Sequence, residues 1–563
     1  MESKEYMLID GNPVEINGEK NLLELIRKTG IELPTFCYHS ELSVYGACRM
    51  CMVENAKGGM EAACSTVPKA GMEIYTNTER LHNYRKMILE LLLANHCRDC
   101  TTCPKNGECR LQELAYLFGI DSIRFKNLRP EPQLDTSSPC ITRDASKCIL
   151  CGDCVRMCNE IQKVGAIDFI NRGSKTVIGP AFNEPIANSQ CVGCGQCAAV
   201  CPTGAIVIHR NTGRVWRELN NKETRVIAQV APAVRVAMAK EFGLPENENS
   251  MGRITAALRK LGFDEVYDTA TGADLTVMEE SKEFLERIEK GEKLPLFTSC
   301  CPAWIQYCEK KHPELMENVS SCKSPMQMFS SVIKAQYADS KKRIVNVAIM
   351  PCTAKKFECQ REEFIHDGVP ETDYVITTQE LVKMIHKAGI VFDEIEPEAV
   401  DSMFSTSTGA GVIFGVTGGV TEAVLRRLAP SEDRKLHLSF AYNDVRGMDG
   451  VKETSITYGG REINIAVVNG LGNVENIIQA MKNGVKYDLI EVMACPGGCI
   501  GGGGQPFCRN ADKDTRTKAI YGADKMLSMR RSEENPLMQN LYDGILKGRE
   551  HELLHVHYGH SEG

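Results

Sequence analysis

The pattern of hydrophobic and polar positions divides the chain into a β-rich beginning, one long helix and a C-terminal half of alternating strands and helices. Residues 6–16, YMLIDGNPVEI, predict two short strands around a turn at residues 11–13, and residues 21–30 predict a helix that ends in glycine. Residues 81–96, LHNYRKMILELLLANH, predict an amphipathic helix with a strongly apolar face.

From about residue 211, short apolar runs alternate with helical patterns. RVIAQVAPAVRVAMA at residues 225–239 and RIVNVAIMPC at residues 343–352 contain apolar, strand-like runs that end in loops, and these loops hold Pro232 and Cys352. Residues 254–268 and 378–390 have helical patterns. Because short buried strands alternate with helices, we expect an α/β domain over residues 211–563, with its sites at the strand ends.

Cysteine content and charge narrow the class of protein. The chain has 26 cysteines among 563 residues, at ligand-like spacings, which favours reduced, metal-binding thiols over a disulfide scaffold. Its net charge of −8 includes no basic block, which argues against nucleic acid as a partner. The N-terminal segment does not resemble a secretory signal, and no apolar run approaches the length of a membrane span. We therefore expect a cytoplasmic protein with no membrane partner.

The first group of cysteines, within residues 1–80, predicts a 2Fe–2S cluster. Its members are Cys37, Cys48, Cys51 and Cys64. The central pair lies in the glycine-bearing loop SVYGACRMC, which can wrap a cluster and direct backbone N–H groups at its sulfurs. Ten residues separate the first two cysteines, where plant-type ferredoxins have four, so the segment resembles the ferredoxin-like domain of the complex I large subunit. A structural zinc ion is the alternative that spacing leaves open.

The second group, within residues 81–135, combines one histidine with three cysteines. Its members are His96, Cys100, Cys103 and Cys109. This spacing resembles the site that binds a 4Fe–4S cluster through three cysteines and one histidine in hydrogenases and complex I. Cys97 could replace His96 as the fourth ligand, but the register of the resemblance favours His96.

The third group, within residues 136–210, is an internal repeat of the pattern Cys-x2-Cys-x2-Cys-x3-Cys. This pattern, present twice, is typical of bacterial ferredoxins with two 4Fe–4S clusters, in which the fourth cysteine of each run binds the other cluster. It therefore predicts two ligand sets, Cys148, Cys151, Cys154 and Cys201 for one cluster and Cys191, Cys194, Cys197 and Cys158 for the other.

Three further cysteine motifs occupy the C-terminal half. They are FTSCCPAW at residues 297–304, MPCTAKKFE at residues 350–358 and MACPGGCIGGGGQP at residues 493–506. Clustered thiolates indicate iron–sulfur ligation, and glycines let the backbone approach a bulky inorganic centre. Taken together and in this order, the three segments resemble the signature motifs of the iron-only (FeFe) hydrogenases.

The resemblance implies an H-cluster, in which a 4Fe–4S cluster is joined to a two-iron subsite that carries CO, cyanide and a bridging dithiolate. It implies that the 4Fe–4S part is bound by Cys301, Cys352, Cys495 and Cys499, with Cys499 also bridging to the subsite. It implies a pocket around the subsite formed by Lys355, Ala231, Pro232, Met350, Met493 and Phe414. Met326 stands where many family members have glutamine, so one hydrogen bond of the family's pocket is not expected here.

The resemblance also implies a proton route through Cys300, Glu280, Ser320 and Glu283, with Arg287 nearby. Without the resemblance, the glutamates in MEESKEFLERIEKGEK would be interpreted as the solvated face of a charged helix. Glu280 and Glu283 do share one helix face, as a relay requires.

The whole chain therefore predicts an α/β multidomain protein. We expect a β-grasp ferredoxin-like domain, a 4Fe–4S domain with one histidine and three cysteine ligands, a ferredoxin-type domain with two 4Fe–4S clusters, and a large α/β H-cluster domain. The implied reaction is 2 H⁺ + 2 e⁻ ⇌ H2, with electrons carried by one 2Fe–2S and three 4Fe–4S accessory clusters.

The implied partners are the maturation enzymes and either ferredoxin or flavin- or NAD(P)-binding partner subunits. A nucleotide site is expected on a partner because the glycines at residues 501–504 lack the strand–GxGxxG–helix setting. The alternatives are a non-catalytic hydrogenase-like iron–sulfur protein and an electron-transfer subunit.

Overall fold

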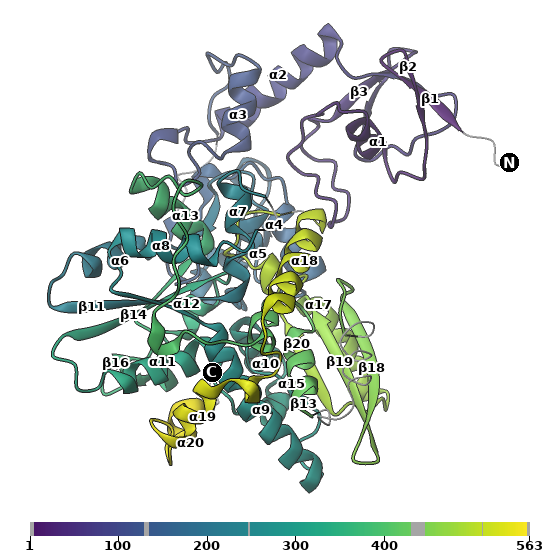
Figure 1. The fold of residues 1–563 in the computed structure, drawn as a ribbon. Helices are drawn as coiled ribbons and strands as arrows, with labels where there is room; N and C mark the ends of the chain where they lie inside the picture. The colour runs from purple at the N-terminus through teal and green to yellow at the C-terminus, as the bar shows by residue number, and fades with distance from the viewer. Residues whose placement is uncertain (1–4, 129–133, 246–247, 429–444, 509, 560–563) are drawn as a thin grey trace.

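The computed structural model describes residues 5–128, 134–245, 248–428, 445–508 and 510–559 (Figure 1). The chain runs from a small N-terminal sheet through a cysteine-rich middle to two larger sheets surrounded by helices (Figure 1). Within the described residues, no helix combines the length and apolar character needed to cross a membrane.

The N-terminal part is a five-stranded sheet in the order β2-β1-β5-β3-β4, with helix α1 packed against it. The elements are β1 (Tyr6–Ile9), β2 (Asn12–Glu15), α1 (Leu22–Lys28), β3 (Met52–Asn55), β4 (Met60–Ala62) and β5 (Glu73–Tyr75). The first turn is shorter than predicted, because Asn12 and Pro13 already pair in β2 and leave Asp10 and Gly11 as the turn, both at positive φ.

The cysteine-rich middle consists of loops held by short elements. These are α2 (Glu79–Ala94), α3 (Arg110–Leu117), α4 (Asp153–Arg156), α5 (Gln196–Ala199), a sheet of β10 (Ile206–Ile208), β7 (Ile141–Asp144) and β6 (Leu134–Asp135), and a pair of β8 (Asp168–Ile170) and β9 (Val177–Gly179). Helices α4 and α5 each begin after a left-handed glycine, Gly152 and Gly195, within the two repeated cysteine runs. The internal repeat therefore has the same local conformation at both places.

The first large sheet is fully parallel, in the order β12-β11-β14-β17. Its strands are β11 (Thr224–Val230), β12 (Glu265–Asp268), β14 (Arg343–Met350) and β17 (Tyr374–Thr377). Strand β11 ends at Val230, just before the predicted loop at Pro232, which cannot donate to a ladder, and the segment continues into α7 (Met238–Glu241). The helical prediction for residues 254–268 is wrong in its second half, where left-handed Gly262 ends α8 (Met251–Leu261) and β12 follows.

The second large sheet has the order β13-β20-β19-β18, in which only β18 is antiparallel to its neighbour. Its strands are β13 (Leu296–Phe297), β18 (Val451–Tyr458), β19 (Arg461–Asn469) and β20 (Leu489–Met493), and a separate pair is formed by β15 (Ile365–His366) and β16 (Val369–Pro370). The helices around both sheets are α6 (Thr212–Leu219), α9 (Ala270–Lys290), α10 (Pro302–Lys311), α11 (Pro325–Gln336), α12 (Lys355–Glu358), α13 (Thr378–Lys387), α14 (Gly409–Ile413), α15 (Gly419–Leu428), α17 (Leu471–Lys482), α18 (Asn510–Met526), α19 (Pro536–Asp543) and α20 (Glu550–Leu554).

The three C-terminal cysteine motifs each begin where a buried parallel strand ends. Cys301 follows β13, Cys352 follows β14 and Cys495 follows β20. Strands β13 and β20 are hydrogen-bonded neighbours in parallel register, so their following loops emerge at the same edge. This is the edge of an α/β sheet at which ligands bind.

Candidate iron–sulfur and active sites

A cavity of about 80 Å³ lies at the carboxyl ends of β11, β13, β14 and β20. Five thiols line it, and four of them belong to the implied ligand set, Cys301, Cys352, Cys495 and Cys499; the fifth is Cys300. Burial raises the pKa of each thiol above its ordinary value, and for all but Cys301 repulsion from other thiols of the set adds to the rise. Thiolates crowded in this way require positive charge between them, which iron ions supply, so the donor set fits an iron–sulfur cluster.

The local backbone favours an anionic cluster at this cavity. Cys301 is the N-cap of α10, and the backbone N–H groups of Ala303 and Trp304 lower its pKa against the effect of burial. The glycine run lets two loops approach closely, since a Cβ on Gly502 would lie 2.2 Å from the carbonyl oxygen of Pro351.

The rest of the cavity wall is mostly apolar, with one charged side chain, that of Lys355, besides Thr269 and Cys300. It includes all six residues implied for the pocket, Lys355, Ala231, Pro232, Met350, Met493 and Phe414, together with Met326. The Nζ atom of Lys355 donates to Glu358 Oε2 at 2.8 Å and to the carbonyl oxygen of Cys300 at 3.4 Å. A buried cation in a mostly apolar wall suits small anionic ligands such as cyanide.

Helix α9 carries Glu280 on its buried side. Its side chain is 0% exposed, and the Ser299 N–H and the Ser320 hydroxyl beside it only partly offset the effect of burial on its pKa. Burial and repulsion from Glu283 raise the pKa of Glu280 to about 8, and burial together with Glu280 raises the pKa of Cys300 well above its ordinary value. The solvated-face interpretation is therefore wrong for Glu280, because the helix packs that face into the core.

Glu283 connects this buried acid to the exterior. Its Oε2 accepts a hydrogen bond from Ser320 Oγ at 2.8 Å, and its Oε1 accepts one from Arg287 Nη2 at 2.5 Å. All three residues line an open cavity of about 530 Å³. The predicted relay residues thus form a series from the inner cavity at Cys300 to the outer cavity at Glu283.

The four N-terminal cysteines also lie together, in the loops beside the first sheet. The Cys48 N–H donates to Cys37 Sγ at 3.3 Å, and the Phe36 N–H donates to Cys48 Sγ at 3.4 Å. Contact with Cys48 raises the pKa of Cys37, and contact with Cys51 raises the pKa of Cys64. Backbone N–H groups directed at sulfur are what the predicted 2Fe–2S loop requires.

Both candidates for the histidine position lie at the second cysteine group. The His96 Nδ1 accepts a hydrogen bond from the Arg98 N–H at 3.0 Å, and the ring is 7% exposed. Burial and then repulsion from Cys103 and Cys97 raise the pKa of Cys100, so Cys97 lies near the set as well. His96 and Cys97 therefore both lie within reach of the second cysteine group.

The repeated cysteine runs interleave as the pattern predicts. After burial, the neighbours that raise the pKa of Cys154 most are Cys151, Cys148 and Cys201. Burial is likewise the main cause for Cys197, followed by Cys191 and Cys158. The fourth cysteine of each run therefore lies with the first three of the other.

The second run also contacts the C-terminal cavity, through residues that sequence reasoning missed. The Gln196 Nε2 donates to the carbonyl oxygen of Gly501 at 2.9 Å, and the Thr353 Oγ1 donates to that of Gly193 at 2.6 Å. A Cβ on Gly503 would lie 2.4 Å from the carbonyl oxygen of Cys194. No local pattern could reveal these contacts, since Gln196 and Gly501 lie 305 positions apart.

The structure places several groups of cysteines next to a buried cavity that is lined with cysteines. A buried acid, Glu280, lies close to Cys300 of that cavity. These features define a multi-cluster iron–sulfur oxidoreductase. Family models match along the chain: a 2Fe-2S iron-sulfur cluster binding domain (residues 6–79), the NADH-ubiquinone oxidoreductase-G iron-sulfur binding region (85–124), a 4Fe-4S dicluster domain (147–205), the iron only hydrogenase large subunit, C-terminal domain (224–503), and the iron hydrogenase small subunit (510–561). The chain belongs to the iron-only hydrogenase family.

Individual relatives match over nearly the whole chain. It is 42% identical to the NADP-reducing hydrogenase subunit HndD of Solidesulfovibrio fructosivorans, over 98% of both chains. It is 35% identical to iron hydrogenase 1 of Clostridium pasteurianum, over 98% of this chain and 99% of that one. The solved FeFe-hydrogenase HydA1 of Chlamydomonas reinhardtii matches with a TM-score of 0.52 and 38% identity, over 62% of this chain and 98% of that chain. These matches confirm the predicted family, the mixed α/β fold and the presence of 2Fe–2S and 4Fe–4S domains.

Proposed function

We propose that this chain interconverts protons, electrons and H2 at an H-cluster held by Cys301, Cys352, Cys495 and Cys499. The observation that carries the proposal is the cavity itself, in which the four ligand thiols, the Cys300 thiol and Lys355 surround a space whose remaining wall is mostly apolar. When bound there, the cluster supplies stored electrons and an open iron position for H2. The protein's part is to orient the cluster, exclude water and move protons.

Protons travel, in this proposal, between Cys300 and the outer cavity through Glu280, Glu283 and Ser320. A thiol and a carboxyl can each release and regain a proton, and the Ser320 hydroxyl donates to Glu283 at 2.8 Å. With its pKa near 8, Glu280 is protonated at neutral pH and can give up that proton at small cost. Arg287 fixes the orientation of Glu283 by pairing with its other oxygen.

Electrons travel through one 2Fe–2S and three 4Fe–4S accessory clusters, bound by the ligand sets predicted from the sequence, with His96 as the noncysteine ligand. The contacts of Gln196 and Gly503 support direct delivery from the last of these clusters to the H-cluster. We further propose a cytoplasmic location, assembly by maturation enzymes, and exchange of electrons with ferredoxin or with a flavin- or NAD(P)-binding partner subunit. Similarity to an NADP-reducing hydrogenase subunit favours the partner-subunit arrangement.

Expression with and without the dedicated maturation enzymes tests this function. The matured protein should contain about 20 iron atoms per chain, show infrared bands of CO and cyanide, and produce H2 with a reduced viologen. The unmatured protein should contain about two fewer irons and have no activity. Full activity without maturation, or a matured protein that lacks the infrared bands, would contradict the H-cluster assignment.

A further inference from the structure

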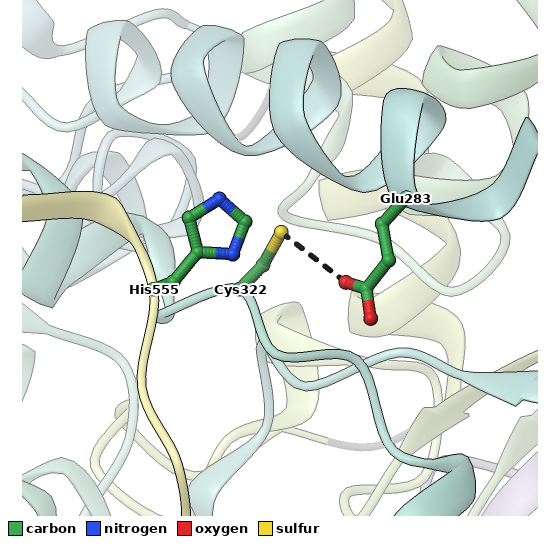
Figure 2. A group of neighbouring side chains, drawn as sticks. All are labelled: Glu283, Cys322 and His555. Atoms are coloured by element: carbon green, nitrogen blue, oxygen red, sulfur yellow. Dashed lines mark hydrogen bonds between the residues drawn. The ribbon is translucent and has the colours of Figure 1, made fainter. Parts of the chain in front are cut away.

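Three side chains from distant parts of the chain meet at the base of the outer cavity. They are Glu283 on helix α9, Cys322 after the relay residue Ser320, and His555 from the C-terminal segment (Figure 2). One candidate ligand atom from each side chain lies within 4.8 Å of the other two. Figure 2 shows the Cys322 sulfur between the imidazole ring and the carboxylate.

Backbone pairing fixes two of the three residues opposite each other. Cys322 and His555 form an antiparallel bridge, flanked by hydrogen bonds from the Lys323 N–H to the carbonyl oxygen of Leu554 at 2.8 Å and from the Val556 N–H to that of Ser321 at 2.7 Å. Because these bonds flank the pair, it is a non-hydrogen-bonded pair, whose side chains project from the same face about 5 Å apart. The thiol and the imidazole are therefore preorganised side by side.

Hydrogen bonds also orient the side-chain atoms that would bind a metal. The His555 Nε2 lies 3.1 Å from Glu279 Oε2, which selects the tautomer that keeps Nδ1 as an acceptor, 2.9 Å from Ser321 Oγ. A histidine held by a carboxylate in this way is the usual arrangement behind a metal-binding imidazole. The Cys322 Sγ donates to Glu283 Oε2 at 3.8 Å, and Arg287 occupies the other carboxylate oxygen.

We propose that Glu283, Cys322 and His555 bind a zinc-type divalent cation, and that the occupied site stops proton transfer through Glu283. One carboxylate, one thiolate and one imidazole form a ligand set that zinc prefers, and water from the outer cavity supplies the fourth position. Glu283, Ser321 and His555 line that cavity, which gives a cation its entry path. Binding releases the Cys322 thiol proton to solvent and displaces the Ser321 hydroxyl from Nδ1.

The inhibitory half of this proposal rests on the proton route proposed above, whereas the metal site does not. A cation on Oε2 would take the lone pairs that now accept from the Ser320 hydroxyl and the Ser321 backbone N–H. Glu283 could then neither receive nor release a proton. The occupied site would thereby inhibit H2 turnover from the outer cavity, without any change at the H-cluster.

Zinc chloride added to the matured holoenzyme tests the metal site directly. X-ray absorption at the zinc edge should report one zinc per chain with one sulfur at about 2.3 Å and nitrogen or oxygen ligands at about 2.0–2.2 Å. Turnover with a viologen should fall and return when a chelator removes the zinc. The iron content and the infrared bands should not change during this cycle.

Two ligand variants and one matched control make the test specific. Cys322→Ser and His555→Gln should each raise the zinc concentration for half-inhibition at least about 10-fold and remove the sulfur or a nitrogen from the zinc spectrum. Cys308→Ser should leave both readings as in the wild type. Cys308 is also a fully buried cysteine, but its thiol donates to the carbonyl oxygen of His312 instead.

Each outcome decides one part of the proposal. Absence of a zinc–sulfur contact in the wild type, or equal zinc sensitivity in both ligand variants and the wild type, overturns the site. Zinc bound with the expected ligands but without inhibition keeps the site and overturns its coupling to proton transfer. Glu283→Gln without zinc tests the route separately, because its turnover should fall even if zinc never binds.

Discussion

Replacing Glu280 by glutamine should make the protein more stable at neutral pH and nearly inactive. The carboxyl is fully buried on α9, and its pKa of about 8 keeps it protonated in the folded protein at pH 7. Glutamine has nearly the same shape but cannot release a proton at any accessible pH. The change therefore removes the proposed relay function while it leaves the packing in place.

The size of the stability effect follows from the two pKa values. The unfolded carboxyl has its ordinary pKa of 4.5 and is ionised at pH 7, so folding at that pH must take up a proton, which costs about 3 kcal/mol. At pH 5.5 the same step costs about 1 kcal/mol. Because a raised pKa makes the folded state bind the extra proton, this contribution falls as pH rises from 4.5 to about 8. Glutamine does not titrate, so the variant lacks this dependence of folding stability on pH, whatever its own contacts contribute.

Anaerobic unfolding at both pH values, together with viologen-linked turnover, measures the two effects. The wild type should lose about 2 kcal/mol more stability than Glu280→Gln between pH 5.5 and pH 7, and the variant's turnover should fall at least about 100-fold. Glu289→Gln is the matched control, since Glu289 is exposed on the same helix. Wild-type turnover in Glu280→Gln would refute the relay, and an unchanged pH slope would refute a neutral carboxyl.

Three other changes separate the proton, ligand and electron functions. Cys300→Ser should lower turnover by orders of magnitude with nearly intact CO and cyanide infrared bands, because a serine hydroxyl is a far weaker acid than a thiol. His96→Ala should remove or convert one accessory cluster, which electron paramagnetic resonance would detect, and it should slow electron delivery while H/D exchange survives. Cys97→Ala should change little. The reverse result would indicate four cysteine ligands. Gly503→Ala should slow electron delivery in the same assay, since its Cβ would lie 2.4 Å from a carbonyl oxygen of the adjacent loop, while Gly522→Ala, with nothing within 4 Å, should not.

The sequence was most informative where the chemistry is local. The cysteine runs predicted iron–sulfur domains because a cluster loop must supply its ligands within a few residues. Strand and helix signals also predicted the α/β class and located β14 and α13. The error at residues 254–268 came from one residue, Gly262, which ends helix α8 inside a continuous pattern.

Contacts between distant segments could not be predicted in this way. The pattern of α9 is compatible with a solvated face, and only the packing of the helix into the core buries Glu280. The cross-strand pair of Cys322 and His555 depends on where the C-terminal segment returns to the domain. Such placements follow from the tertiary fold, for which a single sequence gives no periodic signal.

The energetic cost of Glu280 is itself an argument about function. An electron-transfer subunit needs clusters near its surface, but nothing in that role requires a carboxyl in the core. Burial and repulsion from Glu283 raise the pKa of Glu280, so the side chain destabilises the fold at neutral pH by about 3 kcal/mol without an evident structural gain. Proteins keep such destabilising groups mainly at functional sites, where the reaction requires them. A neutral acid held between Cys300 and Glu283 is what proton transfer to a buried H-cluster requires, and it favours a catalytic over a purely electron-carrying protein.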